Sequence, residues 1–220
     1  MKKLVLILLL LFSVILSSFA VDFKMVSIPD KKIAMLNVEV TQALYQEVTG
    51  DNPSQFYGSD CPVENISWHD AIRFCNRLSK KNGLKKAYII SEENEVTWDK
   101  TANGFRLPTE EEWEYAAKGG ENYKYAGSDD LEDVAWYRNN SGGKTHPVAQ
   151  LDPNGFGLYD MTGNVSEWCW GVNPHNSKSR YIRGGCWYDK ASYCELSYRY
   201  WGSNGNGEGN IGFRIVRNME

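Results

Sequence analysis

The sequence is poor in histidine and has no two cysteines spaced as CxxC, which limits the metal sites that it can hold. Its three histidines, His69, His146 and His175, are scattered along the chain. A structural zinc site needs four clustered Cys or His ligands, so a zinc-finger or zinc-ribbon domain is excluded. The net charge is −4 at pH 7, whereas proteins that bind nucleic acid or anionic lipid typically carry an excess of positive charge. We therefore expect no nucleic-acid partner.

Long apolar runs are also missing, except for one at the start of the chain. Lys2 and Lys3 precede an apolar run over residues 4–16, and Ser18 and Ala20 are small residues suited to signal peptidase cleavage. The run is too short for a comfortable membrane span. We predict a signal peptide over residues 1–20, export to the periplasm, cell surface or medium, and no integral membrane span after cleavage.

The remaining residues, 21–220, are enough for a single domain with its own core, and they contain no internal repeat or low-complexity linker. Short strands are predicted over residues 23–29 and 33–40. Three helices are predicted from their N-terminal caps: Thr41 before residues 42–48, Ser67 in a capping box, and Thr109 in a second capping box. Residues 121–220 are rich in Gly, Asn and aromatics and predict short strands and long loops. The fold class is therefore α+β.

Several motifs in this domain occur in the order seen in one known family. They are residues 65–71 (NISWHDA), 104–117 (GFRLPTEEEWEYAA), 153–161 (PNGFGLYDM), 163–168 (GNVSEW), 183–185 (RGG) and 212–214 (GFR). Together they resemble the formylglycine-generating enzyme (sulfatase-modifying factor) family over nearly the whole mature chain. The resemblance implies a loop-rich variant of the C-type lectin fold with few helices, short strands and adjacent chain termini.

The segment from Gly157 to Trp168 suggests a structural calcium site. Asp160 and Glu167 are two hard carboxylate ligands, and a turn at Gly163 exposes the backbone carbonyls that calcium also prefers. At the matching positions the family binds calcium through Asp160, Glu167 and the carbonyls of Gly163 and Val165. The alternative is that both carboxylates merely cap turns.

The resemblance also indicates that the catalytic chemistry of the family is lost. The enzymes of the family oxidise a substrate cysteine to formylglycine with copper held by two cysteine thiolates, and soft thiolates suit copper(I). Counted forward from the Gly184-Gly185 pair, the first of these cysteines falls on Asp189 and the second on Cys194. We therefore expect no bound copper and no catalytic residue. The alternative function is a formylglycine-generating oxidase, or a related metal-dependent oxygenase, that acts on a cysteine substrate. An approach of Cys186 to Cys194 would be needed to rescue it.

Five cysteines in an exported protein permit disulfides, and the odd number leaves at least one free thiol. Spacing alone does not define the pairing. The family often joins its helix cysteine, here Cys75, to the C-terminal region, which implies a Cys75–Cys194 bridge. A Cys169–Cys186 bridge is a weaker prediction that would leave Cys61 free.

The segment over residues 188–206 combines Tyr and Trp with Ser, Gly and Asn, the composition typical of antibody paratopes. We predict that it binds a ligand, either a protein or a surface glycan. The predicted contact residues are Tyr188, Asp189, Lys190, Tyr193, Glu195, Tyr198, Tyr200, Trp201, Ser203, Asn204 and Asn206.

This arrangement resembles the variable proteins of diversity-generating retroelements, in which randomised adenines in Asn-type codons vary a displayed C-terminal surface. Lys190, Glu195 and Trp201 are not reachable from an Asn codon and count against that hypothesis. Two other hypotheses remain open: an ordinary loop of the family whose aromatics belong to the core, and a structural envelope protein without a specific ligand.

Overall fold

The computed structural model describes residues 23–219, so the predicted signal peptide at residues 1–20 lies outside the described range. Within it the elements are, in chain order, β1 (Met25–Ile28), β2 (Ile33–Leu36), α1 (Gln42–Thr49), α2 (Trp68–Lys81), β3 (Tyr88–Ile90), β4 (Val96–Trp98), β5 (Phe105–Arg106), α3 (Glu110–Lys118), α4 (Leu131–Val134), β6 (Ser166–Asn173), β7 (Asn176–Arg183), the 3₁₀ helix η1 (Ala191–Tyr193), β8 (Tyr200–Ser203), β9 (Ile211–Gly212) and β10 (Val216–Asn218). None of the helices in residues 23–219 is long and apolar enough to cross a membrane.

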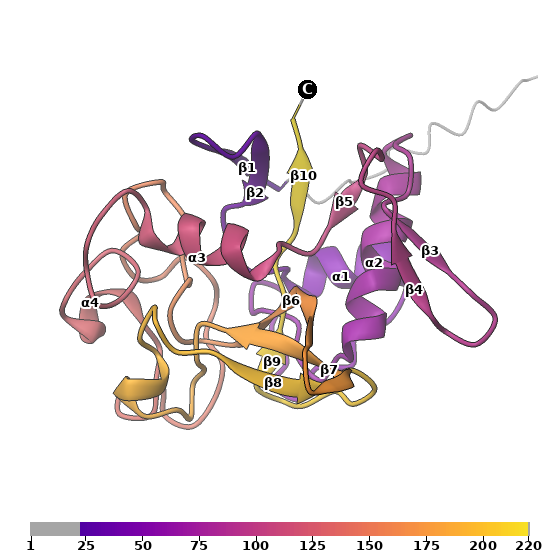
Figure 1. Ribbon diagram of the computed structural model, residues 1–220. Helices are drawn as coiled ribbons and strands as arrows, with labels where there is room; N and C mark the ends of the chain where they lie inside the picture. The colour runs from indigo at the N-terminus through magenta and orange to yellow at the C-terminus, as the bar shows by residue number, and fades with distance from the viewer. Residues whose placement is uncertain (1–22, 220) are drawn as a thin grey trace, which may run out of the picture.

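The first sheet joins the two ends of the described chain. Its strand order is β1-β2-β10-β5, and every neighbouring pair is antiparallel. Met35 of β2 pairs with Val26 of β1 on one side and with Val216 of β10 on the other. Figure 1 shows this sheet at the top of the molecule, next to the C-terminus. The expected closeness of the two ends of the domain is thus present in the fold.

The second sheet lies below the first in Figure 1 and carries the C-terminal loops. Its strand order is β8-β7-β6-β9, with β6 and β7 forming a long antiparallel hairpin and β9 running parallel to β6. The separate β3–β4 hairpin projects beside α2. Within residues 119–165 the described chain has one helix, the four-residue α4, and is otherwise loop.

The three predicted helices begin at their predicted caps, whereas the short helices α4 and η1 lie where the sequence predicts only strands and loops. The Oγ1 of Thr41 accepts a hydrogen bond from the Leu44 amide, and α1 ends at Gly50 with φ of 85°. Ser67 and Thr109 each form a complete capping box, which satisfies backbone donors that a helix N-terminus otherwise leaves free. The second predicted strand is shorter than expected and ends at Leu36. The fold is α+β, as the sequence predicts.

The largest core cluster fills the space between α1, α2 and the second sheet. Trp68, Phe74, Trp168 and Phe213 are among its fully buried members. Apolar residues of α2 and of the C-terminal strands therefore meet in one core, and burial of this area supplies the main stabilisation of the domain. This core supports the second sheet and the loops attached to it.

Candidate functional site

The C-terminal segment between β7 and β9 is attached to the rest of the domain at several points. Buried Arg183 donates from Nη2 to the Leu196 carbonyl (2.7 Å) and forms an ion pair with Glu110 of α3 (3.0 Å). The indole Nε1 of Trp187 donates to the Gly209 carbonyl (3.0 Å). These bonds hold the segment at its start, middle and end, so residues 188–206 are carried on an anchored backbone.

Large aromatic side chains of this segment reach the solvent. Tyr188 and Tyr193 are each 42% exposed. The rings of Tyr193 and Tyr198 stack at a centroid distance of 4.8 Å, and the ring of Tyr200 follows at 6.3 Å from that of Tyr198. Tyr200 lies deepest, and burial raises its pKa. Tyr193, Tyr198 and Tyr200 thus form one row that runs from solvent towards the domain.

Trp201 belongs to the other face of β8. Successive side chains of a strand point to opposite faces. A Cβ on Gly202 would meet Ile182 and Trp168, so Gly202 and Tyr200 face inward. Trp201 is 43% exposed and lies against Tyr181 of β7, at 5.7 Å between ring centroids. The structure therefore divides the predicted contact residues between two faces instead of bringing them all together.

Several of the predicted polar contact residues already have partners within the domain. The Oδ2 of Asp189 accepts hydrogen bonds from the Cys186 amide and thiol, both at 3.1 Å. Glu195 forms an ion pair with Lys124 (3.1 Å), and the Asn204 amide donates to the Lys178 carbonyl. The exposed members of the set are Lys190, Ser203 and Asn206. Asp189 and Glu195 are therefore parts of the scaffold as much as of the surface.

The structure adds a neighbour that the sequence did not suggest. Phe56 packs edge-to-face on Trp187 at 5.3 Å, and Trp187 in turn contacts Tyr188 at 5.1 Å. Tyr57, next to Phe56, is 80% exposed, more than any other large apolar side chain within residues 23–219. No local pattern of the sequence indicates this neighbour, because the contact of Phe56 with Trp187 spans more than a hundred residues.

Cys186, Asp189 and Cys194 lie together at the base of the 188–206 segment. Burial, with a further contribution from the Asp189 charge, raises the pKa of the Cys194 thiol to about 12. Burial and Asp189 also raise the pKa of Cys186. The raised pKa of both thiols disfavours the thiolate form that nucleophilic attack requires.

Asp160 and Glu167 are buried near each other, with Arg214 beside them. Arg214 holds Glu167 through two nitrogens, Nε at 2.8 Å and Nη2 at 2.7 Å, and the Trp113 indole donates to the same carboxylate at 2.7 Å. Asp160 accepts a hydrogen bond from the Ala149 amide at 2.7 Å. Burial raises the pKa of Asp160 to about 6.

Comparison with known proteins now identifies the family. A profile described as the sulfatase-modifying factor enzyme 1-like domain matches residues 15–219. The chain belongs to this family. Chaperone protein LppX of Paenibacillus barcinonensis is 41% identical over 218 residues, which cover 81% of this chain and 78% of that protein. The formylglycine-generating enzyme of Mus musculus is 31% identical over 190 residues, covering 73% of this chain but 44% of the enzyme.

Similar solved structures confirm the expected fold. Treponema denticola variable protein 1 superimposes with a TM-score of 0.81 and 34% identity, covering 90% of this chain and 92% of that one. CarF superimposes with a TM-score of 0.72 and 31% identity, covering 86% and 87% of the two chains. The resemblance to a variable protein, first suggested by the composition of residues 188–206, therefore extends to the whole fold.

Within the family, this chain has a poor donor set for copper(I). At the two expected thiolate positions it carries one carboxylate, Asp189, and one buried thiol, Cys194. Cys186 is close by, but its thiol is engaged with Asp189. A hard carboxylate is a poor substitute for a soft ligand.

The calcium arrangement expected from the family does not fit the structure well. Calcium takes six to eight oxygen ligands, but Glu167 is already bound by Arg214 and Trp113. The guanidinium also repels a divalent cation at that carboxylate. The remaining predicted calcium ligands are Asp160 and the carbonyls of Gly163 and Val165, because the Glu167 carboxylate is already engaged.

The predicted disulfide between Cys75 and Cys194 is not formed in the structure. All five cysteines are buried free thiols. Cys75 lies on α2 in the large core cluster, whereas Cys194 packs in a separate cluster with Tyr125 and Tyr137. Cys169 and Cys186 are likewise unbridged.

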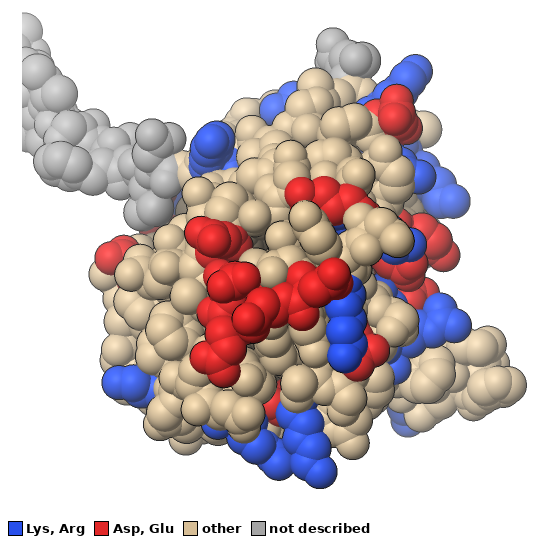
Figure 2. All heavy atoms as spheres, turned by 90° about the vertical axis from the view of Figure 1, so that its left-hand side faces the viewer, with Lys and Arg blue, Asp and Glu red and all other residues tan. Residues whose placement is uncertain are grey.

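The side of the molecule that carries α4 is acidic. Figure 2 shows a group of Asp and Glu side chains near its centre. On α4 and its N-cap, Asp130, Glu132 and Asp133 are all exposed. Such a face repels phosphate groups, so it favours neither nucleic acid nor an anionic membrane as a partner.

Proposed function

We propose that this chain is a non-catalytic binding domain that recognises a protein through residues 188–206. The observation that carries the proposal is the row of Tyr193, Tyr198 and Tyr200, with Tyr188 exposed nearby, on an anchored backbone. Rigid aromatic side chains lose little conformational entropy on binding and supply most of the energy at recognition surfaces. The exposed Tyr57 loop, which packs on Trp187, extends this surface.

A protein ligand suits the surface better than a surface glycan. Sugars need several free hydrogen-bonding groups beside any aromatic ring that stacks on them, and here Asp189 and Glu195 are already paired within the domain. Exposed aromatic area is instead suited to an apolar patch on a protein. Two relatives are described as a chaperone protein and as a variable protein. Neither description names an enzyme.

Diversification of residues 188–206 is the finer part of the proposal. The similarity to Treponema denticola variable protein 1 supports it. Deep sequencing of the gene in sibling lineages tests it directly. Changes confined to adenine-derived positions of codons 188–206, with Trp187 and Cys194 constant, are the expected result. A uniform segment would remove diversification from the proposal and leave binding untouched.

Export is a further part of the proposal, since the N-terminal run has the composition of a signal peptide. N-terminal sequencing of protein recovered from the medium or the cell envelope tests it, with Val21 as the expected first residue. Recovery of uncleaved protein from the cytosol would contradict it.

Binding is tested with a double variant, Tyr188→Ala with Tyr193→Ala. Envelope and secreted proteins captured by the immobilised domain are quantified by mass spectrometry, and each candidate is then purified and titrated. A true ligand should lose at least about tenfold in affinity with the double variant, because each aromatic anchor contributes about 1–2 kcal/mol. Ile89→Ala, which alters an exposed apolar residue on β3, is the matched control.

Two results would contradict this assignment. If the double variant unfolds, the tyrosines belong to the core and the segment is an ordinary loop of the family. If it stays folded and every purified ligand binds unchanged, recognition uses another surface.

A further inference from the structure

A cavity of about 570 Å³ opens on the first sheet, away from the 188–206 segment. Figure 1 shows the two sites at opposite ends of the molecule, with β1, β5 and β10 at the top and β8 at the bottom. Strand register places Ala34, Arg217 and Phe105 side by side, because Ala34 pairs with Arg217 and Arg217 pairs with Phe105. Paired residues share one face of a sheet, so the small Ala34 leaves room next to larger neighbours.

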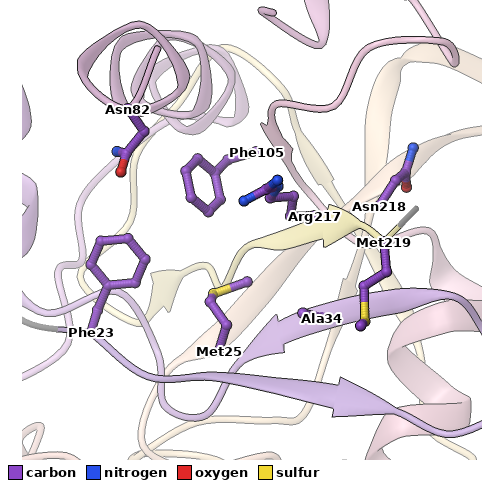
Figure 3. A pocket seen from close by; sticks show the side chains of 8 residues that line it. All are labelled: Phe23, Met25, Ala34, Asn82, Phe105, Arg217, Asn218 and Met219. Carbon is purple, nitrogen blue, oxygen red and sulfur yellow. The ribbon is translucent and has the colours of Figure 1, made fainter. Parts of the chain in front are cut away.

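The cavity walls are apolar and adaptable. Phe23 and Phe105 contribute rings that meet edge-on at 5.8 Å between centroids. Met25 and Met219 line the floor and the far end, and thioether side chains can fit ligands of different shape. Figure 3 shows these four side chains around the open space. An apolar group of side-chain size fits between them.

Arg217 brings into this apolar site a charge that has no ion-pair partner in the described part of the chain. Its Nε donates to the Asn103 carbonyl at 3.1 Å, and no carboxylate of residues 23–219 forms an ion pair with it. Three other arginines of the domain, Arg106, Arg183 and Arg214, are each paired with a glutamate. A guanidinium with a free planar fork is well matched to a carboxylate, which it binds through two parallel hydrogen bonds.

Two amide side chains complete the polar part of the site. The Oδ1 of Asn218 accepts from Arg106 Nη2 at 2.7 Å, so its Nδ2 is left to donate. Asn82, at the end of α2, donates from Nδ2 to the Leu78 carbonyl at 2.9 Å, which leaves its Oδ1 to accept. Figure 3 shows Asn82 and Asn218 on either side of Arg217. The site thus offers donors for an anion and one acceptor for an N–H group.

We propose that this cavity binds the free carboxyl terminus of a peptide or protein whose last side chain is apolar. Arg217 and Asn218 hold the carboxylate, Asn82 accepts from the last peptide amide, and the Phe23, Met25 and Phe105 walls enclose the side chain. A fatty acid shares the carboxylate and the apolar part, but it has no N–H for Asn82. An adjoining cavity shares Asn218 and Met219 and is bordered by Lys100, which favours acidic residues before the terminus.

The experiment uses the full mature domain and a fluorescein-labelled peptide that ends in Asp-Ala-Leu with a free carboxylate. Fluorescence anisotropy measures binding of this peptide, of the same peptide with an amidated C-terminus, and of versions ending in Met or Phe. Saturable binding of the free acids is expected, with at least about tenfold weaker binding of the amide, because a charge-assisted pair is lost. Unlabelled decanoate is added as a competitor.

Variants separate recognition from folding. Arg217→Met keeps most of the apolar stem and should weaken peptide binding about tenfold or more, whereas Arg217→Lys should retain part of it. Asn82→Ala, at an exposed helix end, should weaken the peptide but leave decanoate unaffected. Thermal unfolding of each variant establishes that it is folded. Tyr188→Ala with Tyr193→Ala should bind the peptide like the wild type, so this site and the proposed function fail or succeed separately.

Four outcomes would overturn the proposal. The free acids and the amide could bind equally well, which means that the carboxylate is not recognised. Decanoate could bind while none of the peptides does, which would make the site one for fatty acids. Binding could also survive in a folded Arg217→Met variant, or be absent for all the peptides up to about 1 mM, the weakest affinity that such contacts should give.

Discussion

Glu39 and Asp160 are carboxylates buried close to Glu167, and Arg214 offsets their charge only in part. Burial is the largest cause that raises the pKa of each, to about 6 for Asp160, and neighbouring acids add to the effect. A raised folded-state pKa means that the folded protein holds its protons more tightly than the unfolded chain does. The contribution of protonated Asp160 to the free energy of unfolding is therefore complete below the unfolded-state pKa near 4. It is lost as the pH rises through the folded-state pKa of about 6.

Asp160→Asn tests this account. Removal of the buried charge should raise the free energy of unfolding at pH 7.5 by up to about 3 kcal/mol and flatten its decline between pH 5 and 7. Asparagine keeps the acceptor for the Ala149 amide and tolerates the φ of 54° at this position. Urea unfolding at several pH values measures the effect, with the exposed Asp152→Asn as control. A loss of stability at pH 7.5 would indicate that the carboxylate is required, for instance as a metal ligand.

We expect no copper chemistry because Asp189 places a carboxylate where the resemblance implies a cysteine. Asp189→Cys restores two cysteines at the spacing of the family enzymes. We expect this variant to bind copper(I) more tightly than the wild type by about tenfold or more, because thiolates are the ligands that this ion prefers. Competition with a colorimetric copper(I) chelator measures it, and Asp189→Ser is the control. Equal affinity in all three proteins would show that the local backbone no longer supports the site.

At the scale of the element, β8 is positioned by a glycine. Gly202 lies over the core, where an added Cβ would come within 2.4 Å of Ile182 and 2.8 Å of Trp168. Gly202→Ala should therefore push β8 outward and lower the free energy of unfolding by about 1–3 kcal/mol. Ser203→Ala, next along the strand and exposed, should change it little. If Gly202→Ala is as stable as Ser203→Ala, the strand is not held by that contact.

The capped helices are the elements that the sequence predicts best. Caps and capping boxes act between residues three apart, so Thr41, Ser67 and Thr109 reveal helix starts without knowledge of the fold. Strand pairing is different, since β10 inserts between β2 and β5 from the other end of the chain. No local pattern reports such a long-range pairing. The sequence therefore predicts short strands but not their order in the sheets.

At the scale of the whole molecule, Arg214 neutralises Glu167, a carboxylate that the resemblance implies as a calcium ligand. We expect EDTA to leave the thermal unfolding midpoint unchanged and added calcium to raise it by less than 1 °C, whereas a ligand at a hundred times its Kd stabilises a protein by about 2.7 kcal/mol. Differential scanning calorimetry gives the answer. A clear rise with calcium would show that the ion displaces Arg214 and would restore the site predicted from the sequence.

A reducing agent should likewise leave the thermal unfolding midpoint of the domain unchanged. The structure has five buried free thiols, and a native disulfide typically contributes about 2–4 kcal/mol. The unfolding midpoint of protein purified from the envelope should be the same with and without dithiothreitol. A marked drop on reduction, together with a cross-linked Cys75–Cys194 peptide by mass spectrometry, would support the bridge implied by the family.

The sequence by itself determined the family, the α+β class and the starts of α1, α2 and α3. The resemblance further implies that Asp189 stands at a thiolate position of the family. These features depend on neighbouring residues or on motifs read in order. The tertiary structure alone decided that Trp201 faces away from Tyr200 and that Phe56 packs on Trp187. It also decided that Arg214 forms an ion pair with Glu167. It also assembled the Arg217 cavity from both ends of the chain. Each of these depends on contacts between residues distant in sequence, and such contacts leave no periodicity or spacing by which to recognise them.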